Sequence, residues 1–61
     1  MYNVIAINHL NFKDYNETFN EFCEAKNTFD TIINEHKYYY TTVYIIDNDT
    51  CEILEYYDKN N

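Results

Sequence analysis

The nucleophilic and soft metal-ligating side chains of this 61-residue chain are few and far apart in sequence: His9, Cys23, His36 and Cys51. A zinc site needs ligands at short, regular spacings, and no CxxC, HxxxH or HExxH spacing occurs here. A catalytic cysteine needs a histidine beside it, and nothing in the sequence brings the two types together. Because the chain shows no secretion signal, both cysteines are expected to be reduced, packed thiols. We therefore expect no enzymatic activity, no catalytic residue, no metal site and no cofactor.

Carboxylates are the abundant reactive groups. Eleven Asp and Glu residues stand against four Lys and no Arg, which gives a formal net charge of -7. Five of the carboxylates step along the chain by three, four, three and eleven residues, so they share one stripe if the segment is helical: Asp14, Glu17, Glu21, Glu24 and Glu35. Such an acidic stripe could mimic the charge of a nucleic acid and bind a basic protein. The alternative is a solvated face that only keeps a small protein in solution.

The element that would carry this stripe is a predicted helix over residues 14–36. Its apolar residues recur in steps of three, four and seven, which is the spacing of one helical face. Asp14 followed by Glu17 predicts the helix start, with Asn11 as the alternative cap. Lys26 interrupts the apolar face, so either its stem reaches the edge of that face or the helix breaks there.

Three further segments have the β-branched, aromatic composition of strands: 2–8, 38–46 and 51–57. The last two flank the polar turn 47–50 and predict a hairpin. The order β-α-β-β with a right-handed crossover predicts a single small α+β domain over residues 1–61. Its helix would cover one face of a three-stranded, mainly antiparallel sheet in the order 1-3-2. Residues 58–61 are expected to form a frayed polar tail.

The face of this sheet away from the helix is expected to stay uncovered, because one helix covers only one face. With a four-residue turn at 47–50, the register turns Val43, Ile45, Leu54 and Tyr56 toward the helix. The open face would then carry Tyr40, Tyr44, Ile46, Ile53 and Tyr57. Aromatic and aliphatic groups exposed together usually mark an interface, either in a homodimer or with a target. The alternative is a solvated face whose tyrosines are simply good strand residues.

The composition excludes several classes of protein. With four Lys, no Arg and a pI of about 4.4, the chain has no basic surface for direct binding to nucleic acid. No run of about 18 apolar residues predicts a membrane span. The absence of glycine excludes the phosphate-binding loops of nucleotide-binding proteins.

The segment from Tyr44 to Leu54 reads Tyr-Ile-Ile-Asp-Asn-Asp-Thr-Cys-Glu-Ile-Leu. It resembles the D-x-x-T-G-E hairpins of small accessory proteins of phages, with Cys51 at the position of the glycine that takes the left-handed turn conformation. The composition, rich in Asn and Lys and free of Arg, is similar to that of proteins from AT-rich phage or low-GC bacterial genomes. Some short acidic phage proteins inhibit host defence, including anti-CRISPR proteins that act as nucleic-acid mimics. The resemblance identifies no functional residues.

Charge and resemblance together predict a non-enzymatic inhibitor, encoded by a phage or mobile element, that occupies the basic nucleic-acid-binding surface of a host defence protein. With no signal peptide, its expected location is the cytoplasm of the host bacterium. Its partner would be a protein, contacted through the acidic stripe, with no direct contact to nucleic acid or membrane. The alternative is a small homodimeric structural or assembly module whose acidic surface serves only solubility.

Overall fold

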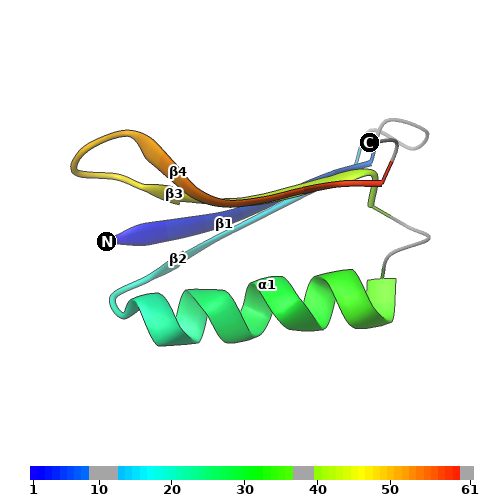
Figure 1. The fold of residues 1–61 in the computed structure, drawn as a ribbon, viewed down its shortest axis with the longest axis horizontal. Helices are drawn as coiled ribbons and strands as arrows, with labels where there is room; N and C mark the ends of the chain where they lie inside the picture. Colours follow the sequence, from blue (N-terminus) through cyan, green and yellow to red (C-terminus); the bar gives the residue numbers. More distant parts are fainter. Residues whose placement is uncertain (9–12, 37–39, 60–61) are drawn as a thin grey trace.

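The computed structural model of the chain describes residues 1–8, 13–36 and 40–59. One helix, α1 (Phe22–His36), lies against one face of a four-stranded sheet (Figure 1). The strands are β1 (Tyr2–Asn8), β2 (Lys13–Phe19), β3 (Thr42–Asp47) and β4 (Glu52–Asp58). The predicted α+β class, with one helix and an antiparallel sheet, is confirmed. The prediction of three strands is wrong.

The sheet order is β2-β1-β3-β4, and every neighbouring pair is antiparallel. The predicted order placed the first strand at an edge, whereas β1 lies inside the sheet between β2 and β3. Since β2 and β3 both run opposite to β1, they are parallel to each other, and α1 is the crossover that connects them. The prediction that the strand 2–8 is the first member of the β-α-β unit is therefore wrong, because β1 is antiparallel to β3. The unit is β2-α1-β3, and β1 is the strand inserted between its two parallel members.

Strand β2 replaces the first turns of the predicted helix. Tyr15 and Phe19 are four residues apart, a spacing that fits one face of a helix and equally one face of a strand. Both side chains pack against the core from β2, and the exposed Glu17 lies between them. Asn16 and Thr18 have low helix propensity. Pairing with β1 along the whole of β2 satisfies the backbone groups on the inner edge of this segment, which favours the strand.

The helix begins at Phe22, not at Asp14. The Ala25 amide donates a hydrogen bond of 3.2 Å to the Glu21 carbonyl, so Glu21 is the residue that precedes the first helical turn. The prediction of a cap at Asp14 is therefore wrong, because that residue belongs to β2. The alternative cap, Asn11, lies outside the described residues.

The core lies between α1 and the two central strands. Among the described residues, these apolar side chains are buried: Val4, Ala6, Ala25, Phe29, Ile32, Val43 and Ile45. The buried positions of α1 step by four and three, which is the period of a helix, while those of β1 and β3 alternate. Ala25 is completely buried, and its small side chain lets the helix approach the sheet closely.

The β3–β4 hairpin turns at residues 48–51, one residue later than predicted. Asp47 and Glu52 form the last strand pair before the turn. The Cys51 amide donates a hydrogen bond of 2.7 Å to the Asp47 carbonyl, which closes the turn. Cys51 has a φ of 62°, the left-handed conformation that the resemblance assigned to a glycine at this position.

A β-bulge in the same hairpin changes which face the end of β4 presents. Leu54 has no opposite residue in the register, which shifts by one at this point. A shift by one residue moves every following side chain to the other face. Tyr57 therefore lies opposite Val43, on the helix side, and Tyr56 lies opposite Tyr44, on the open side. The faces predicted for Tyr56 and Tyr57 are wrong for this reason.

The ends of the strands agree with the sequence in part. β1 has the predicted bounds, whereas β3 begins at Thr42 rather than at position 38, and positions 37–39 lie outside the described residues. β4 continues to Asp58, and the Lys59 amide donates a hydrogen bond of 2.9 Å to the Thr41 carbonyl. The predicted frayed tail is therefore wrong for these two residues, and residues 60 and 61 lie outside the described part.

Candidate functional site

The carboxylates predicted to form one helical stripe lie on different elements. Asp14 and Glu17 belong to β2. Glu21 precedes α1, and only Glu24 and Glu35 lie on the helix. A single helical stripe of five carboxylates is therefore ruled out, because the segment before Phe22 is extended or turning rather than helical.

Three carboxylates remain on the helix layer: Glu21, Glu24 and Glu35, the helix-layer carboxylates. All three side chains are exposed. Glu24 and Glu35 are separated by about three helical turns, so they lie on the same side of α1, roughly 16 Å apart along its axis. Glu24 is in the first turn, where the partial positive charge of the helix terminus favours a carboxylate. Within the described part of the chain, none of the three forms an ion pair.

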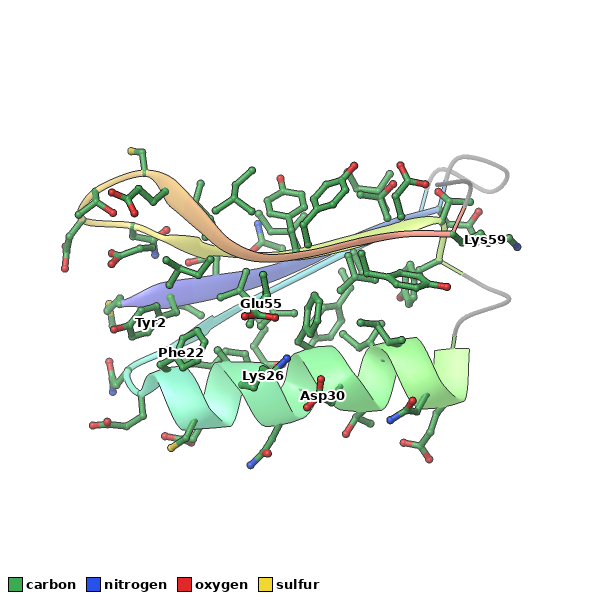
Figure 2. The ribbon with its side chains drawn as sticks, viewed as in Figure 1. Tyr2, Phe22, Lys26, Asp30, Glu55 and Lys59 are labelled. Carbon is green, nitrogen blue, oxygen red and sulfur yellow. The ribbon has the colours of Figure 1, made fainter. Side chains whose placement is uncertain are left out.

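Lys26, near the middle of α1, does not offset these charges because two other carboxylates hold it. Its ammonium lies 3.3 Å from Asp30 Oδ1, 3.1 Å from Glu55 Oε1 and 5.0 Å from the centre of the Phe29 ring (Figure 2). The hydrogen bond to Glu55 is the main cause that raises the pKa of Lys26; partial burial opposes the rise and Asp30 adds to it. The helix is unbroken here, and Lys26 connects α1 with β4.

Glu17 is held by its own strand. The Tyr15 hydroxyl donates a hydrogen bond to the Glu17 carboxylate. Burial of the phenol, followed by this hydrogen bond and the nearby negative charge of Glu17, raises the pKa of Tyr15 to about 12. Tyr15 therefore stays protonated over the physiological range and keeps the Glu17 carboxylate at the edge of the sheet.

The second candidate surface is the open face of the sheet, opposite α1, from which side chains project in Figure 2. The register places Tyr44, Ile46 and Ile53 on this face, where the sequence analysis expected them. Tyr40 and Tyr57 do not belong to it, because both pack against the core on the helix side. Two further groups on this face were not predicted from the sequence: Tyr56, which the bulge turns outward, and the isoleucines that alternate with the buried residues of β1.

A polar corner completes the open face next to β2. The side-chain amide of Asn3 donates a hydrogen bond to Asn16 Oδ1. Asn3 Oδ1 in turn accepts hydrogen bonds from the side-chain amide of Asn48 and the hydroxyl of Thr18. This cluster ties β1 and β2 to the hairpin turn. It was also missed, and the available signal was the alternation of Asn3 with apolar residues along the first strand.

The cysteines and histidines do not form a reactive centre in the described part of the chain. Cys23 and Cys51 are free thiols, as expected, but both are exposed rather than packed. His36 ends α1, and His9 lies outside the described residues. Among the described residues, no group of three or more His, Cys, Asp and Glu side chains could hold a metal ion.

Within the described ranges, no helix is long and apolar enough to cross a membrane. No family model, curated protein or solved structure matched the chain when it was compared with all three. Function is therefore inferred from the helix-layer carboxylates and the open face.

Proposed function

We propose that this chain is a non-enzymatic acidic binding protein that occupies the nucleic-acid-binding surface of a basic host protein. The observation that supports this function is that the helix-layer carboxylates are exposed and form no ion pair in the described part of the chain. A basic groove would supply the cations that this surface lacks. The net charge of -7 would steer the two proteins together before contact.

The spacing of the carboxylates favours mimicry of charge rather than of individual phosphates. The roughly 16 Å between Glu24 and Glu35 along α1 corresponds to about five phosphates of one DNA strand, which rise 3.4 Å each. Glu21 adds a third charge one turn before Glu24. A groove shaped for a nucleic-acid backbone would therefore meet negative charge over a comparable length, and binding would rest on long-range attraction.

Occupation of such a groove would exclude nucleic acid from it, which makes the protein an inhibitor. The resemblance of its hairpin and composition to small acidic phage proteins supports an anti-defence role in the cytoplasm of a host bacterium. The helix layer is the surface proposed to contact the target.

The test uses the heparin-binding protein fraction of a bacterial lysate as the probe. The immobilised chain is expected to retain a basic protein from this fraction. Short duplex DNA should release that protein because it binds the same basic groups, and salt should release it because it screens the attraction. Replacing Glu21, Glu24 and Glu35 with Gln should weaken the retention of that protein by at least about tenfold, since each lost ion pair contributes about 0.5 kcal/mol.

Two matched controls separate this surface from net charge and from general damage. One neutralises three carboxylates of the hairpin, by Asp47→Asn, Asp49→Asn and Glu52→Gln. The other changes three exposed neutral positions of α1, by Asn27→Gln, Thr31→Ser and Asn34→Gln. Retention that DNA does not release, or that falls equally in the hairpin control, contradicts the proposal.

The alternative function is a homodimeric structural module whose carboxylates only keep it in solution. The open apolar face of the sheet favours this alternative. The two functions differ in the effect of the triple Gln variant. A module built on the apolar face would still self-associate in that variant and would lose self-association on Tyr44→Glu or Ile53→Glu.

A further inference from the structure

Three of the large apolar side chains that are exposed in the described part of the chain lie close together on β4. Ile53 is 56% exposed, Tyr56 55% and Leu54 37%. The neighbouring strand continues the apolar surface, because Ile46 lies opposite Ile53 and Tyr44 lies opposite Tyr56. On β1, Ile5 lies opposite Tyr44. The residues that the register places on the open face form the open-face patch: Ile5, Tyr44, Ile46, Ile53 and Tyr56.

The open-face patch is uncharged although the protein is strongly acidic. Among the described side chains of the open face, the nearest carboxylate is Asp58, whose Oδ2 accepts a hydrogen bond of 3.2 Å from the Tyr56 hydroxyl at one end of the patch. The opposite corner is occupied by the neutral cluster around Asn3. A basic protein would find few carboxylates to bind here, and an anionic membrane would repel a chain with a net charge of -7.

We infer that a second copy of this chain covers the open-face patch, so that the protein is a homodimer whose two sheets stack face to face. The second copy is the occupant that offers an equally apolar and equally uncharged surface. Two acidic chains approach most easily where each presents few carboxylates. The register confines the carboxylate positions of the described open face to one end row, which holds Asp14 and Asp58, and leaves the open-face patch uncharged. Aromatic and branched side chains then interdigitate between sheets about 10 Å apart.

A two-fold axis that crosses the strands fits the charges of this face. Such an axis places the Asp58 end of one copy over the Asn3 end of its partner. The two Asp58 carboxylates then lie at opposite ends of the interface, so they do not repel each other at close range.

The area of the face is sufficient for a dimer of moderate affinity. Figure 1 views the sheet approximately along its edge, so the face extends over the longest and shortest dimensions of the molecule, 30 Å and 19 Å. A face of roughly 600 Å² on each copy gives a total near 1,200 Å², the lower end of the range for specific interfaces. The dimer is therefore expected to dissociate measurably at micromolar concentrations.

Salt should strengthen this dimer, because it screens the repulsion between two chains that each carry a net charge of -7. Binding of a basic partner to the helix-layer carboxylates should instead weaken with salt. The sign of the salt effect therefore distinguishes the two surfaces, and the dimer does not depend on the proposed inhibitory function.

The experiment measures the mass of the full chain by sedimentation equilibrium over a range of concentrations, at about 0.05 and 0.5 M salt. The expected mass rises with concentration to twice the 7.5 kDa of one chain and does so at lower concentration in high salt. Ile53→Glu should raise the dissociation constant at least about tenfold, because it buries a charge in the interface. Thr31→Glu, which adds the same charge on the exposed side of α1, should leave the dissociation constant nearly unchanged.

A second variant distinguishes stacked faces from pairing of the β4 edges. Tyr44→Glu changes β3, which is inside the sheet, so it should disrupt stacking but not edge pairing. Circular dichroism establishes that each variant is folded. A mass of 7.5 kDa at every concentration, a dimer that dissociates in high salt, or a dimer sensitive to Ile53→Glu but not to a folded Tyr44→Glu would overturn the inference.

Discussion

At the scale of the residue, Cys51 carries a conformational cost that another residue would avoid. Its φ of 62° lies in the left-handed region, where a residue with a Cβ is roughly 1–2 kcal/mol less favourable than in the right-handed region. Glycine lacks the Cβ but loses more backbone entropy on folding. We therefore expect Cys51→Gly to raise the free energy of unfolding by about 0.5–1 kcal/mol, measured by urea denaturation.

The matched control for this prediction is Cys51→Ala. Alanine also lacks the thiol but keeps the Cβ, so its free energy of unfolding should stay close to that of the parent chain. Equal stabilisation by glycine and alanine would show that the thiol, and not the backbone conformation, limits the stability of the hairpin.

Tyr15 gives the protein an alkaline sensitivity. Its pKa rises from 10.0 to about 12 in the folded chain, so the folded state keeps a proton that the unfolded state loses. The stability contributed by protonated Tyr15 is complete below pH 10 and is lost as the pH rises through about 12. In Tyr15→Phe, the free energy of unfolding should fall less steeply between these pH values, as denaturation at stepped pH would measure. An unchanged slope would contradict the role of Tyr15.

At the scale of the element, the sequence predicts correctly those elements whose apolar residues fit either the helical period or the strand period, but not both. The bounds of β1 and the presence of the hairpin follow from composition and turn residues. The segment 13–19 is different, because Tyr15 and Phe19 at a spacing of four satisfy both the helical and the strand period. The segment forms a strand because it pairs with β1, and no local sequence pattern encodes that contact. The predicted acidic stripe required this segment to be helical, so it is not formed once Asp14 and Glu17 lie on β2.

The candidate surfaces show the same limit. The open face could be inferred because a single helix leaves one side of a sheet uncovered, and Tyr44 and Ile46 alternate with buried neighbours. The bulge at Leu54 could not be inferred, since it depends on how β4 packs against β3. It exchanges the faces of Tyr56 and Tyr57, which is why the residues past Leu54 were assigned to the wrong side.

The contact between α1 and the sheet depends on a small residue at its closest point. Ala25→Leu should lower the free energy of unfolding by about 1–3 kcal/mol, because the larger side chain does not fit where Ala25 is completely buried. Thr31→Leu places the same residue on the exposed side of α1 and should be neutral or slightly stabilising, since leucine has the higher helix propensity. Thermal denaturation of both variants tests this, and equal effects would contradict close packing at Ala25.

At the scale of the whole molecule, the unbalanced charge should make folding sensitive to salt. The longest dimension of the protein is 30 Å, so many of its carboxylates lie within a few Debye lengths of one another at low ionic strength. Raising salt from about 0.01 to 0.3 M should therefore increase the urea midpoint of unfolding. Glu24→Lys should reduce this salt dependence because it removes two units of net negative charge. A midpoint that falls with salt would contradict net repulsion in the folded chain.

The central position of β1 has a consequence for how the chain folds. β1 pairs with β3, which follows it at a distance of about forty residues, whereas β3 and β4 are neighbours in sequence. Contacts between distant segments form slowly because a long loop must close first. The pairs β1–β2 and β3–β4, each made of strands that are neighbours in sequence, are expected to form early, and docking of β1 against β3 should be the late step that assembles the sheet. The centre of the sheet is thus the last part to close, and until the two pairs of strands meet, β1 and β3 each expose an unpaired inner edge.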